Sequence, residues 1–584
     1  MPGWKTAVSL IAASVTLMGL SAPALAGARE SGVREGVEEH PCPAPVPAGT
    51  TCGYLLVPER RDAYRSDTVR VGFAVRRVDS PAGPPVVFTN GGPGMSSIQL
   101  TGTIAAIAPD RDVVVMEQRG GAFSEPRLEC PEIVTGALKE LTSTGPAKGD
   151  MALAARACRA RLTSDLRGFR TQEIAADVVE LRRTLGYDKW SLFGVGYSTR
   201  MMLLAAAMDP EGTASVVLDS YLPESYAVYD EAPAALRSMA DRLGVAGRYD
   251  QMVRNLNAEP VSLATRDPLT RARVEVSLSG DDVATLLAES VSDPEVLPIL
   301  PALIDGLADG QTDLLSPLVD AAAATMTGRE WGLYYSVQCQ DEWPSNQIRS
   351  RALFTVFNDA TTCAEWRLPA SGEEGALTQS PVLVLAGQYD PAIPAEKVRT
   401  ASEKLPAARF QEFAGVGYGV FEVSDCGRKT IGAFLADPAA PAPCDPAKAP
   451  RALVEPGDVH LTPAGYTTTG FPWAVAPLGA FALLSLFQVA GGAITVRRGG
   501  LLTLLAGLAG AAFCAVAAWS VWAVSDRVAF TVGIPPIIFW ASLLPIAATC
   551  LSVVAAFRDR APGVLILPAA TGLIFTAWLI GWVL

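Results

Sequence analysis

The segment Trp190 to Arg200, WSLFGVGYSTR, has the pattern of a strand that enters a sharp turn and continues as a helix. In enzymes that form an acyl-serine intermediate, such a turn carries G-x-S-x-G and presents the serine above the strand as a nucleophile. Here the central position is Gly196, and Ser198 follows two residues later. The segment therefore has the setting of a nucleophile without a nucleophilic side chain at its centre.

The flanking sequence predicts the elements that would position this turn. Two segments before the turn, PPVVFTNGGPG and RDVVVMEQRGG, are each an apolar run that ends in a glycine-rich turn. A further apolar run, PVLVLAGQYD, follows later in the chain. Between them, Ile174, Val178, Leu181 and Leu185 have helical spacing, and Gly186 ends the helix. Strands that alternate with helices indicate an α/β domain with a mostly parallel sheet covered on both faces.

Two segments depart from this alternation. Residues 225–335 are predicted to be mainly helical, without clear strands, as in a lid inserted between sheet strands. We therefore expect a core in two parts, 40–224 and 336–445, separated by that lid. Residues 446–470 are rich in Pro and Ala with little periodicity and are predicted to be a tether.

The first residues have the features of a secretory signal. Lys5 supplies positive charge, a short apolar core follows, and an A-x-A site precedes Gly27. We expect residues 1–26 to be a signal peptide, with an uncleaved anchor helix as the alternative. In both cases the segment that follows is exported.

The C-terminal part, 471–584, is predicted to cross a membrane four times. Each apolar run is close to the roughly 20 residues that span a bilayer. The loops with Arg497 and Arg498 and with Arg558 and Arg560 are expected to be cytoplasmic by the positive-inside rule, while Asp526 and Arg527 offset each other. The prediction is a multi-pass plasma-membrane protein with its large N-terminal domain outside. The four runs are approximately 471–495, 500–524, 530–556 and 563–584.

Charge excludes two function classes. The predicted spans contain no charged residue, and Gln488 is their only strongly polar side chain, which argues against a transporter or channel. The net charge of -13 argues against nucleic acid as a partner, because phosphate binding needs a basic surface. Anchoring or lateral association in the membrane is the expected role of the four helices.

Eight of the ten cysteines lie in the exported part. An even number in an oxidising compartment predicts four disulfides, although many connectivities are open. Pairing of sequential neighbours is the simplest. Neither a metal nor another cofactor is expected, because there is no C-x-x-C and the chain has only His40 and His460. The predicted pairs are Cys42–Cys52, Cys130–Cys158, Cys339–Cys363 and Cys426–Cys444.

An ordered set of motifs between roughly residues 40 and 445 resembles the secreted tripeptidyl and prolyl aminopeptidases of the α/β-hydrolase superfamily. The resemblance implies an α/β-hydrolase fold with a helical lid, but it does not extend to the four C-terminal helices. The matching motifs are NGGPG at Asn90–Gly94, EQRGGAFS at Glu117–Ser124, the segment around Gly196, CQDEW at Cys339–Trp343, LAGQYDPAIP at Leu385–Pro394 and GVGYGV at Gly415–Val420.

The resemblance places a catalytic triad on three positions of this chain. It puts the nucleophile at Gly196, the acid at Asp390 and the base at Tyr418, so only the acid retains the family's chemistry. It also implies an oxyanion corner from the backbone of the NGGPG turn and the amide of Tyr197. The turn's glycines are Gly91, Gly92 and Gly94.

Two further assignments remain open. Ser198 is an alternative nucleophile, but no histidine is near it in the sequence, and the Tyr418 phenol, with an ordinary pKa of about 10, is a poor base near neutral pH. In relatives, an acidic residue near the CQDEW segment holds the free amino group of the substrate. Asp341 or Glu342 would do so here, unless they form a solvated acidic pair.

Two hypotheses follow. The first is a membrane-tethered pseudohydrolase that binds a peptide, a peptidoglycan fragment or a protein partner outside the cell. The second is an active exported aminopeptidase or esterase that uses Ser198. The absence of both serine and histidine from the triad positions favours the first.

Overall fold

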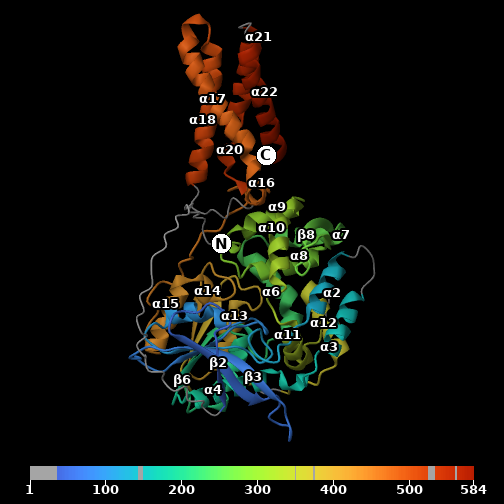
Figure 1. The fold of residues 1–584 in the computed structure, drawn as a ribbon, viewed down its shortest axis with the longest axis vertical. Coiled ribbons are helices and arrows are strands. Elements are labelled where there is room, and N and C mark those ends of the chain that lie inside the picture. Colours follow the sequence, from blue (N-terminus) through green and yellow to red (C-terminus); the bar gives the residue numbers. More distant parts are fainter. Residues whose placement is uncertain are drawn as a thin grey trace, which may run out of the picture.

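The computed structural model describes residues 36–142, 149–348, 350, 352–372, 375–523, 533–558 and 562–584. The predicted signal peptide, 1–26, lies outside these ranges, as do Asp526, Arg527 and Arg560. Figure 1 shows a mixed α/β body, a lid beside it and a group of long apolar helices at one end.

A nine-stranded sheet forms the centre of the body, in the order β1-β2-β3-β5-β4-β6-β7-β10-β11. The pairs from β1 to β5 are antiparallel, and those from β5 to β11 are parallel. The predicted, mostly parallel sheet is confirmed. The strands are β1 (Val37–His40), β2 (Thr50–Pro58), β3 (Thr68–Arg76), β4 (Val86–Thr89), β5 (Val113–Met116), β6 (Trp190–Val195), β7 (Thr213–Asp219), β10 (Val382–Gly387) and β11 (Ala408–Phe413).

Helices cover both faces because successive side chains of the buried strands point to opposite sides. Phe193 packs in a cluster with α1 (Thr101–Ile107) and α15 (Asp425–Ala436), and its neighbour Leu192 packs in another. The second face is covered by α4 (Thr171–Leu185), α5 (Tyr197–Met208) and α13 (Ala395–Ser402). Further helices of the body are α2 (Pro131–Thr142), α3 (Asp150–Arg161), α11 (Trp331–Val337), α12 (Phe354–Trp366) and α14 (Val420–Val423).

The lid has its own hydrophobic core and contains a β-hairpin among its helices. The expectation of a segment without clear strands is therefore wrong. Leu263 and Thr265 are buried while Ser262 and Ala264 are exposed, and Asp267 closes the turn. The two-residue periodicity of this short strand did not lead to a predicted strand because the sequence around it has a helical pattern. The elements are α6 (Val228–Arg242), α7 (Ala246–Ala258), β8 (Val261–Arg266), β9 (Arg273–Leu278), α8 (Gly280–Ser290), α9 (Leu300–Ala308) and α10 (Ser316–Thr325).

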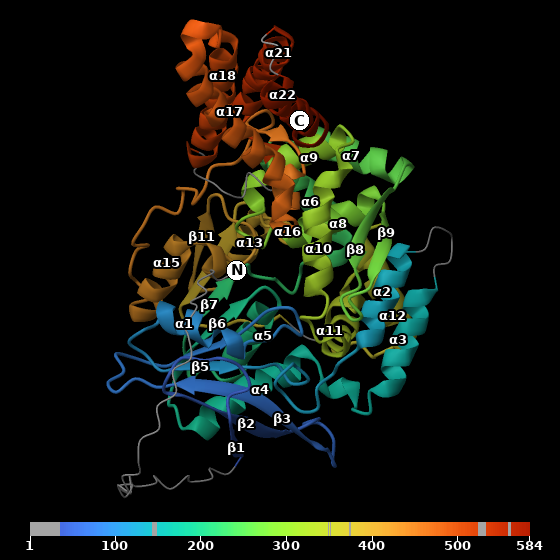
Figure 2. The same cartoon turned by 45° about the horizontal axis from the view of Figure 1, so that its top comes forward.

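The predicted tether is fastened along its length. The Ala414 N–H donates to the carbonyl of Pro446 at 2.9 Å, and the Val454 N–H donates to that of Pro298 in the lid at 2.7 Å. Further on, β12 (His460–Leu461) pairs with β13 (Gly533–Ile534), which lies between apolar helices. Figures 1 and 2 show α16 (Ala464–Gly470) between the lid and those helices. The segment therefore holds core, lid and helices together.

Four helices are long and apolar enough to cross a membrane, in agreement with the prediction. Gln488 donates to the Ser552 hydroxyl at 2.8 Å between two of them, so the polar side chain noted in the sequence serves helix packing. The spans are Trp473–Arg498, Leu501–Ser520, Pro536–Arg558 and Ile566–Val583. They comprise α17 (Ala476–Thr495), α18 (Leu501–Ala523), α20 (Pro536–Ala541), α21 (Leu543–Arg558) and α22 (Pro562–Trp578).

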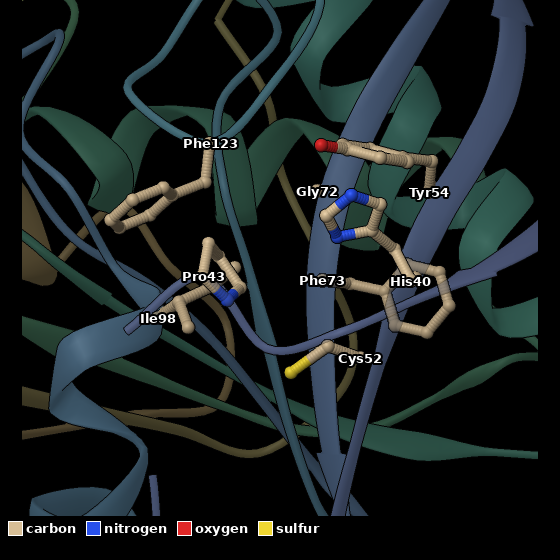
Figure 3. A pocket seen from close by; sticks show the side chains of 9 residues that line it. His40, Pro43, Cys52, Tyr54, Gly72, Phe73, Ile98 and Phe123 are labelled. Atoms are coloured by element: carbon tan, nitrogen blue, oxygen red, sulfur yellow. The ribbon is translucent and has the colours of Figure 1, made fainter. Parts of the chain in front are cut away.

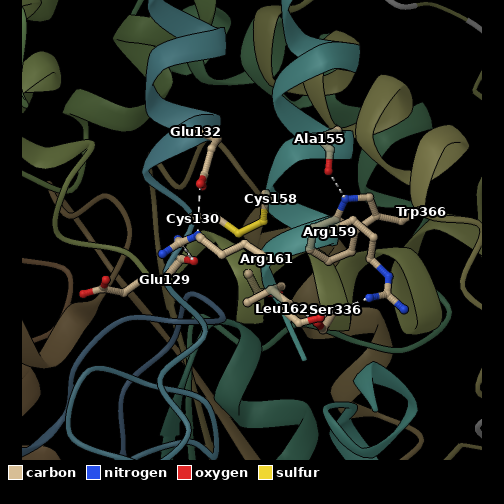
Figure 4. Close-up of a disulfide and its surroundings, with 11 residues drawn as sticks. Glu129, Cys130, Glu132, Ala155, Cys158, Arg159, Arg161, Leu162, Ser336 and Trp366 are labelled. Carbon is tan, nitrogen blue, oxygen red and sulfur yellow. Dashed lines mark hydrogen bonds and ion pairs between the residues drawn. A yellow bond between two sulfur atoms is a disulfide. The ribbon is translucent and has the colours of Figure 1, made fainter. Parts of the chain in front are cut away.

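The structure joins all four predicted cysteine pairs. Cys130–Cys158 links α2 to α3, and the Trp366 indole N–H donates to the Ala155 carbonyl at 2.9 Å to attach α12 (Figure 4). Cys130, Glu132 and Cys158 also lie close enough together to suggest a metal site. Because the two sulfurs are bonded to each other, they offer no thiolate ligand.

Candidate functional site

Gly196 lies at the turn between β6 and α5, with φ 54° and ψ -118°. Its positive φ is the strained conformation that a nucleophile adopts at such a turn. The Gly196 N–H donates to the Asp219 carbonyl at 2.9 Å, which ties the turn to β7. A Cβ on Gly194 would lie 2.6 Å from the Ser198 carbonyl oxygen, so the close approach of helix and strand requires glycine there. We call this turn, from Val195 to Ser198, the elbow. Its geometry is thus present although its central residue is glycine.

Tyr418 fills the space above the elbow. A Cβ built on Gly196 would lie 2.7 Å from Tyr418 Cζ and nearer still to the phenol oxygen, and a Cβ on Gly91 would lie 3.0 Å from that oxygen. The phenol therefore occupies the volume between the elbow and the NGGPG turn that the side chain of a nucleophile would take. Burial raises the pKa of Tyr418 well above its ordinary value, so the group is a neutral phenol.

The Tyr418 hydroxyl forms no hydrogen bond with any residue that the structure describes. The side chain is only partly buried. Its O–H is therefore a donor whose capacity is unused by the protein.

The loop after β11 that carries Tyr418, called the Tyr418 loop below, is anchored by the end of β7. Asp219 accepts the N–H of Val420 at 2.9 Å and that of Phe421 at 2.7 Å, and the Ser220 hydroxyl accepts the Gly419 N–H at 3.0 Å. Burial raises the pKa of Asp219 to about 7. The sequence analysis did not identify Asp219, although an acidic residue that ends the apolar run SVVLD was a usable signal.

Asp390 lies directly beyond β10, where the resemblance predicts the acid. Its Oδ1 accepts the N–H of Ala392 at 2.9 Å and that of Ile393 at 3.1 Å. Its Oδ2 is buried and has no well-formed hydrogen bond within the described ranges. Burial raises the pKa of Asp390 to about 6, although these two N–H groups and the Ser220 hydroxyl lower it. The carboxyl oxygen that would orient a histidine base therefore faces none.

The NGGPG turn retains the backbone of an oxyanion corner, but its amides are partly engaged. Gly92 and Gly94 have φ of 115° and 85°. The Gly94 N–H donates to Gln118 Oε1 at 3.0 Å, and the Gly91 N–H donates to Asn90 Oδ1 at 2.8 Å. Two predicted donors thus stabilise the turn itself.

Glu117 supports this turn from the end of β5. Its Oε1 accepts the Ser96 hydroxyl at 3.0 Å, the Ser97 N–H at 2.8 Å and the Ile98 N–H at 2.9 Å. Burial raises the pKa of Glu117 to about 7. This side chain therefore fixes the segment that follows the turn.

Ser198, the alternative nucleophile, is fully buried. Its hydroxyl donates to the Thr89 carbonyl at 2.7 Å and accepts the Val195 N–H at 2.8 Å. These bonds join the ends of β4 and β6, which is the work of a structural hydroxyl in the first turn of a helix.

Asp341 and Glu342 are enclosed, so the alternative of a solvated acidic pair is wrong. Asp341 Oδ2 accepts the N–H and hydroxyl of Thr171 at 2.8 and 2.6 Å, and Glu342 Oε2 accepts Arg200 Nη1 at 2.8 Å. Thr171 Oγ1 also lies 2.9 Å from the hydroxyl of Tyr197, the residue after the elbow. Asp341 Oδ1 is buried and has no well-formed hydrogen bond within the described ranges. Burial raises the pKa of Asp341, although Thr171 and the Ser371 hydroxyl lower it.

Neither histidine can serve this site. His40 packs against Tyr54 at the sheet edge, with the two rings tilted by 58°, and lines a cavity of about 10 Å³, room for one water molecule at most (Figure 3). None of the residues lining that cavity belongs to the elbow or to the Tyr418 loop. His460 lies in β12, beside the apolar helices.

A strand-turn-helix elbow, an acid beyond β10 and a glycine-rich turn opposite the elbow define an α/β-hydrolase site. The chain belongs to that family, because the family model described as alpha/beta hydrolase fold matches residues 84–425, more than half of its length. The predicted membership is therefore confirmed.

The relatives found are hydrolases. The serine protease Hip1 of Mycobacterium bovis and that of Mycobacterium tuberculosis are each 22% identical over 409 residues, covering 60% of this chain and 78% of theirs. The crystal structure of proline iminopeptidase from Mycobacterium smegmatis aligns with a TM-score of 0.35 and 16% identity, over 65% of this chain and 97% of that one.

Proposed function

We propose that this protein is a membrane-anchored, extracellular α/β-hydrolase homologue of the aminopeptidase type that binds a peptide, a cell-wall fragment or a protein partner and does not cleave it. The observation that carries the proposal is the position of Tyr418, whose phenol oxygen occupies the volume of the nucleophile's side chain above Gly196.

The chemistry of acyl transfer is missing at two of its three positions. Gly196 has no hydroxyl to attack a carbonyl, and Tyr418, with its raised pKa, cannot take a proton near neutral pH. Asp390 is the triad residue that the chain retains, and it has no base to orient. Triad members act as a unit, so a remaining acid supplies little catalysis.

Relocated catalysis at Ser198 is not favoured. A nucleophilic hydroxyl must reach both a base and the substrate, whereas this one is fully buried and bonded to the backbone of two strands. Its attack on an external carbonyl would require the ends of β4 and β6 to separate.

The proposed location is the plasma membrane, with several passes and the hydrolase domain outside. Four disulfides favour an oxidising compartment, and four apolar helices favour a membrane anchor. The orientation by the arginine-bearing loops stays a prediction.

The test is activity-based labelling of the full chain in detergent. We expect no labelling by a fluorophosphonate and no turnover of aminoacyl or ester substrates. Gly196→Ser alone should also stay unlabelled and should lower the thermal midpoint, because the new side chain collides with Tyr418. Gly196→Ser combined with Tyr418→His removes the collision and places a base toward Asp390, so this variant serves as the positive comparison. Labelling of the unmodified chain at Ser198, abolished by Ser198→Ala, would contradict the proposal.

A further inference from the structure

Arg329 is fixed beside the elbow by the backbone. It precedes α11 and forms an isolated β-bridge with Met95, directly after the NGGPG turn. The next residue, Glu330, donates its N–H to the Gly94 carbonyl at 2.9 Å. A residue of the lid's end is thereby held against the turn that faces Tyr418.

The Arg329 guanidinium rests on aromatic rings. Its Cζ lies 5.1 Å from the Trp331 ring centroid and 4.8 Å from that of Tyr334, distances at which a cation is attracted to the ring face. The side chain is half-buried and makes no ion pair with any described residue. Neighbouring Glu330 is already paired with Arg127 at 2.7 Å. The aromatic shelf therefore orients the positive charge. Buried Asp359 is close enough for the Arg329 charge to lower its pKa, but its Oδ2 already accepts the hydroxyls of Tyr229 and Tyr334.

The Tyr418 hydroxyl lies near Gly91 of the same turn, 3.0 Å from the position of a Cβ on that residue. It too has no partner within the described part of the chain. Arg329 bridges to Met95 directly after the NGGPG turn, and Tyr418 lies against Gly91 within it, so both side chains are positioned by the same turn. A guanidinium and a phenol O–H, both with unused donors, are a combination suited to carboxylate oxygens.

The acidic groups around the two donors leave them available. Asp219 has both carboxyl oxygens bonded to backbone N–H groups, and Asp390 has one. Glu422 and Glu289 are exposed to solvent and form no ion pair with any described residue. Glu289 feels the Arg329 charge without forming an ion pair, which makes it the natural competitor of a ligand carboxylate.

We propose that Arg329 and Tyr418 bind a carboxylate group of the ligand at the former catalytic centre. This site rests on the proposed function, since the phenol can donate to a ligand only where no nucleophile occupies its place. The ligand class is a peptide or related molecule that presents a free carboxylate, from its C-terminus or from an acidic side chain.

The experiment measures binding by calorimetry to the full chain in detergent. The probes are acetyl-Ala-Ala, its C-terminal amide, and acetyl-Glu amide. We expect at least one carboxylate probe to bind about tenfold or more tightly than the uncharged amide. The tighter of the two carboxylate probes identifies the source of the group. Equal affinity for all three probes, or no binding of either carboxylate, would overturn the proposal.

Variants locate the effect. Arg329→Gln should abolish the preference for carboxylate, Arg329→Lys should retain part of it, and Glu289→Gln should strengthen it. Arg254→Gln removes an exposed arginine of the lid helix α7 and is the matched control for loss of one charge. A preference that survives in Arg329→Gln contradicts the site even where the wild-type preference is present. The labelling test is separate from the binding test. Labelling or turnover contradicts the proposed function, whereas the absence of a carboxylate preference contradicts only the carboxylate site.

Discussion

The two sides of the elbow differ in how their polar groups are used. On one side, Glu117 Oε1 accepts three donors and Gln118 bonds both ends of the NGGPG turn. On the other side, the Tyr418 hydroxyl and Asp390 Oδ2 lack partners within the described ranges. The groups that hold the shape of the site are thus more extensively bonded than those at the triad positions, although Glu117 Oε2, like Asp390 Oδ2, has no partner among the described residues. The proposed binding function predicts such a difference, and the variants below test it.

Glu117→Ala should give the largest effect on this comparison. It leaves a hydroxyl and two backbone N–H groups without their acceptor in a buried place, at about 1–3 kcal/mol each. We expect a loss of about 3–5 kcal/mol, measured as a large fall in the thermal midpoint of the full chain in detergent.

Glu117→Gln is the matched control, because it keeps an acceptor oxygen. It should lose far less stability than Glu117→Ala. If the two variants were equally destabilised, the hydrogen bonds to Oε1 would not be what stabilises the turn.

The sequence predicted the scaffold well because its signals are local. The strand and helix periodicities, the elbow and the pairing of neighbouring cysteines each depend on residues close together in the chain. The β8–β9 hairpin was missed because its two short alternating strands lie within a helical segment. Residue types alone predicted that the elbow has no nucleophile and that the base position has no histidine.

The filling of the site by Tyr418 was not predictable in this way. It depends on how the loop after β11 packs over the turn after β6, elements that are more than 200 residues apart in the chain. The position of Asp219 at the end of an apolar run can be seen in the sequence, but the bonds by which it holds that loop cannot. Motifs thus predict which elements meet, whereas the contacts made between them require the structure.

Asp390→Asn should have an effect of intermediate size and opposite sign. The folded pKa of about 6 lies above the ordinary value, so ionisation of Asp390 disfavours the folded state. The stability associated with its protonated form is fully present below about pH 4 and is lost as the pH rises through about 6. Asparagine keeps the Oδ1 acceptor and removes the charge, so we expect a gain of about 1–3 kcal/mol at pH 7.

The measurement is the difference in thermal midpoint between Asp390→Asn and wild type from pH 4 to 8. The difference cancels the contribution of Glu117, whose pKa is also raised, and it includes the fall in the raised pKa of Asp219 when the Asp390 charge is removed. It should be small at pH 4 and grow toward pH 7. A loss of stability at pH 7 would indicate that the carboxylate has a favourable partner.

Tyr418→Phe should have the smallest effect on stability. The hydroxyl has no hydrogen bond to lose, and the ring that fills the space above Gly196 is retained. The free energy of unfolding, followed through the thermal midpoint, should therefore change by less than about 0.5 kcal/mol. Tyr418→Ala is the contrasting variant, because it empties that space and should cost about 2–4 kcal/mol. If Tyr418→Phe were as costly as Tyr418→Ala, the hydroxyl would stabilise the fold and would not be held in reserve for a ligand. A neutral result combined with weaker carboxylate binding would separate the two roles of this residue, since the ring then closes the catalytic centre and the oxygen recognises what binds there.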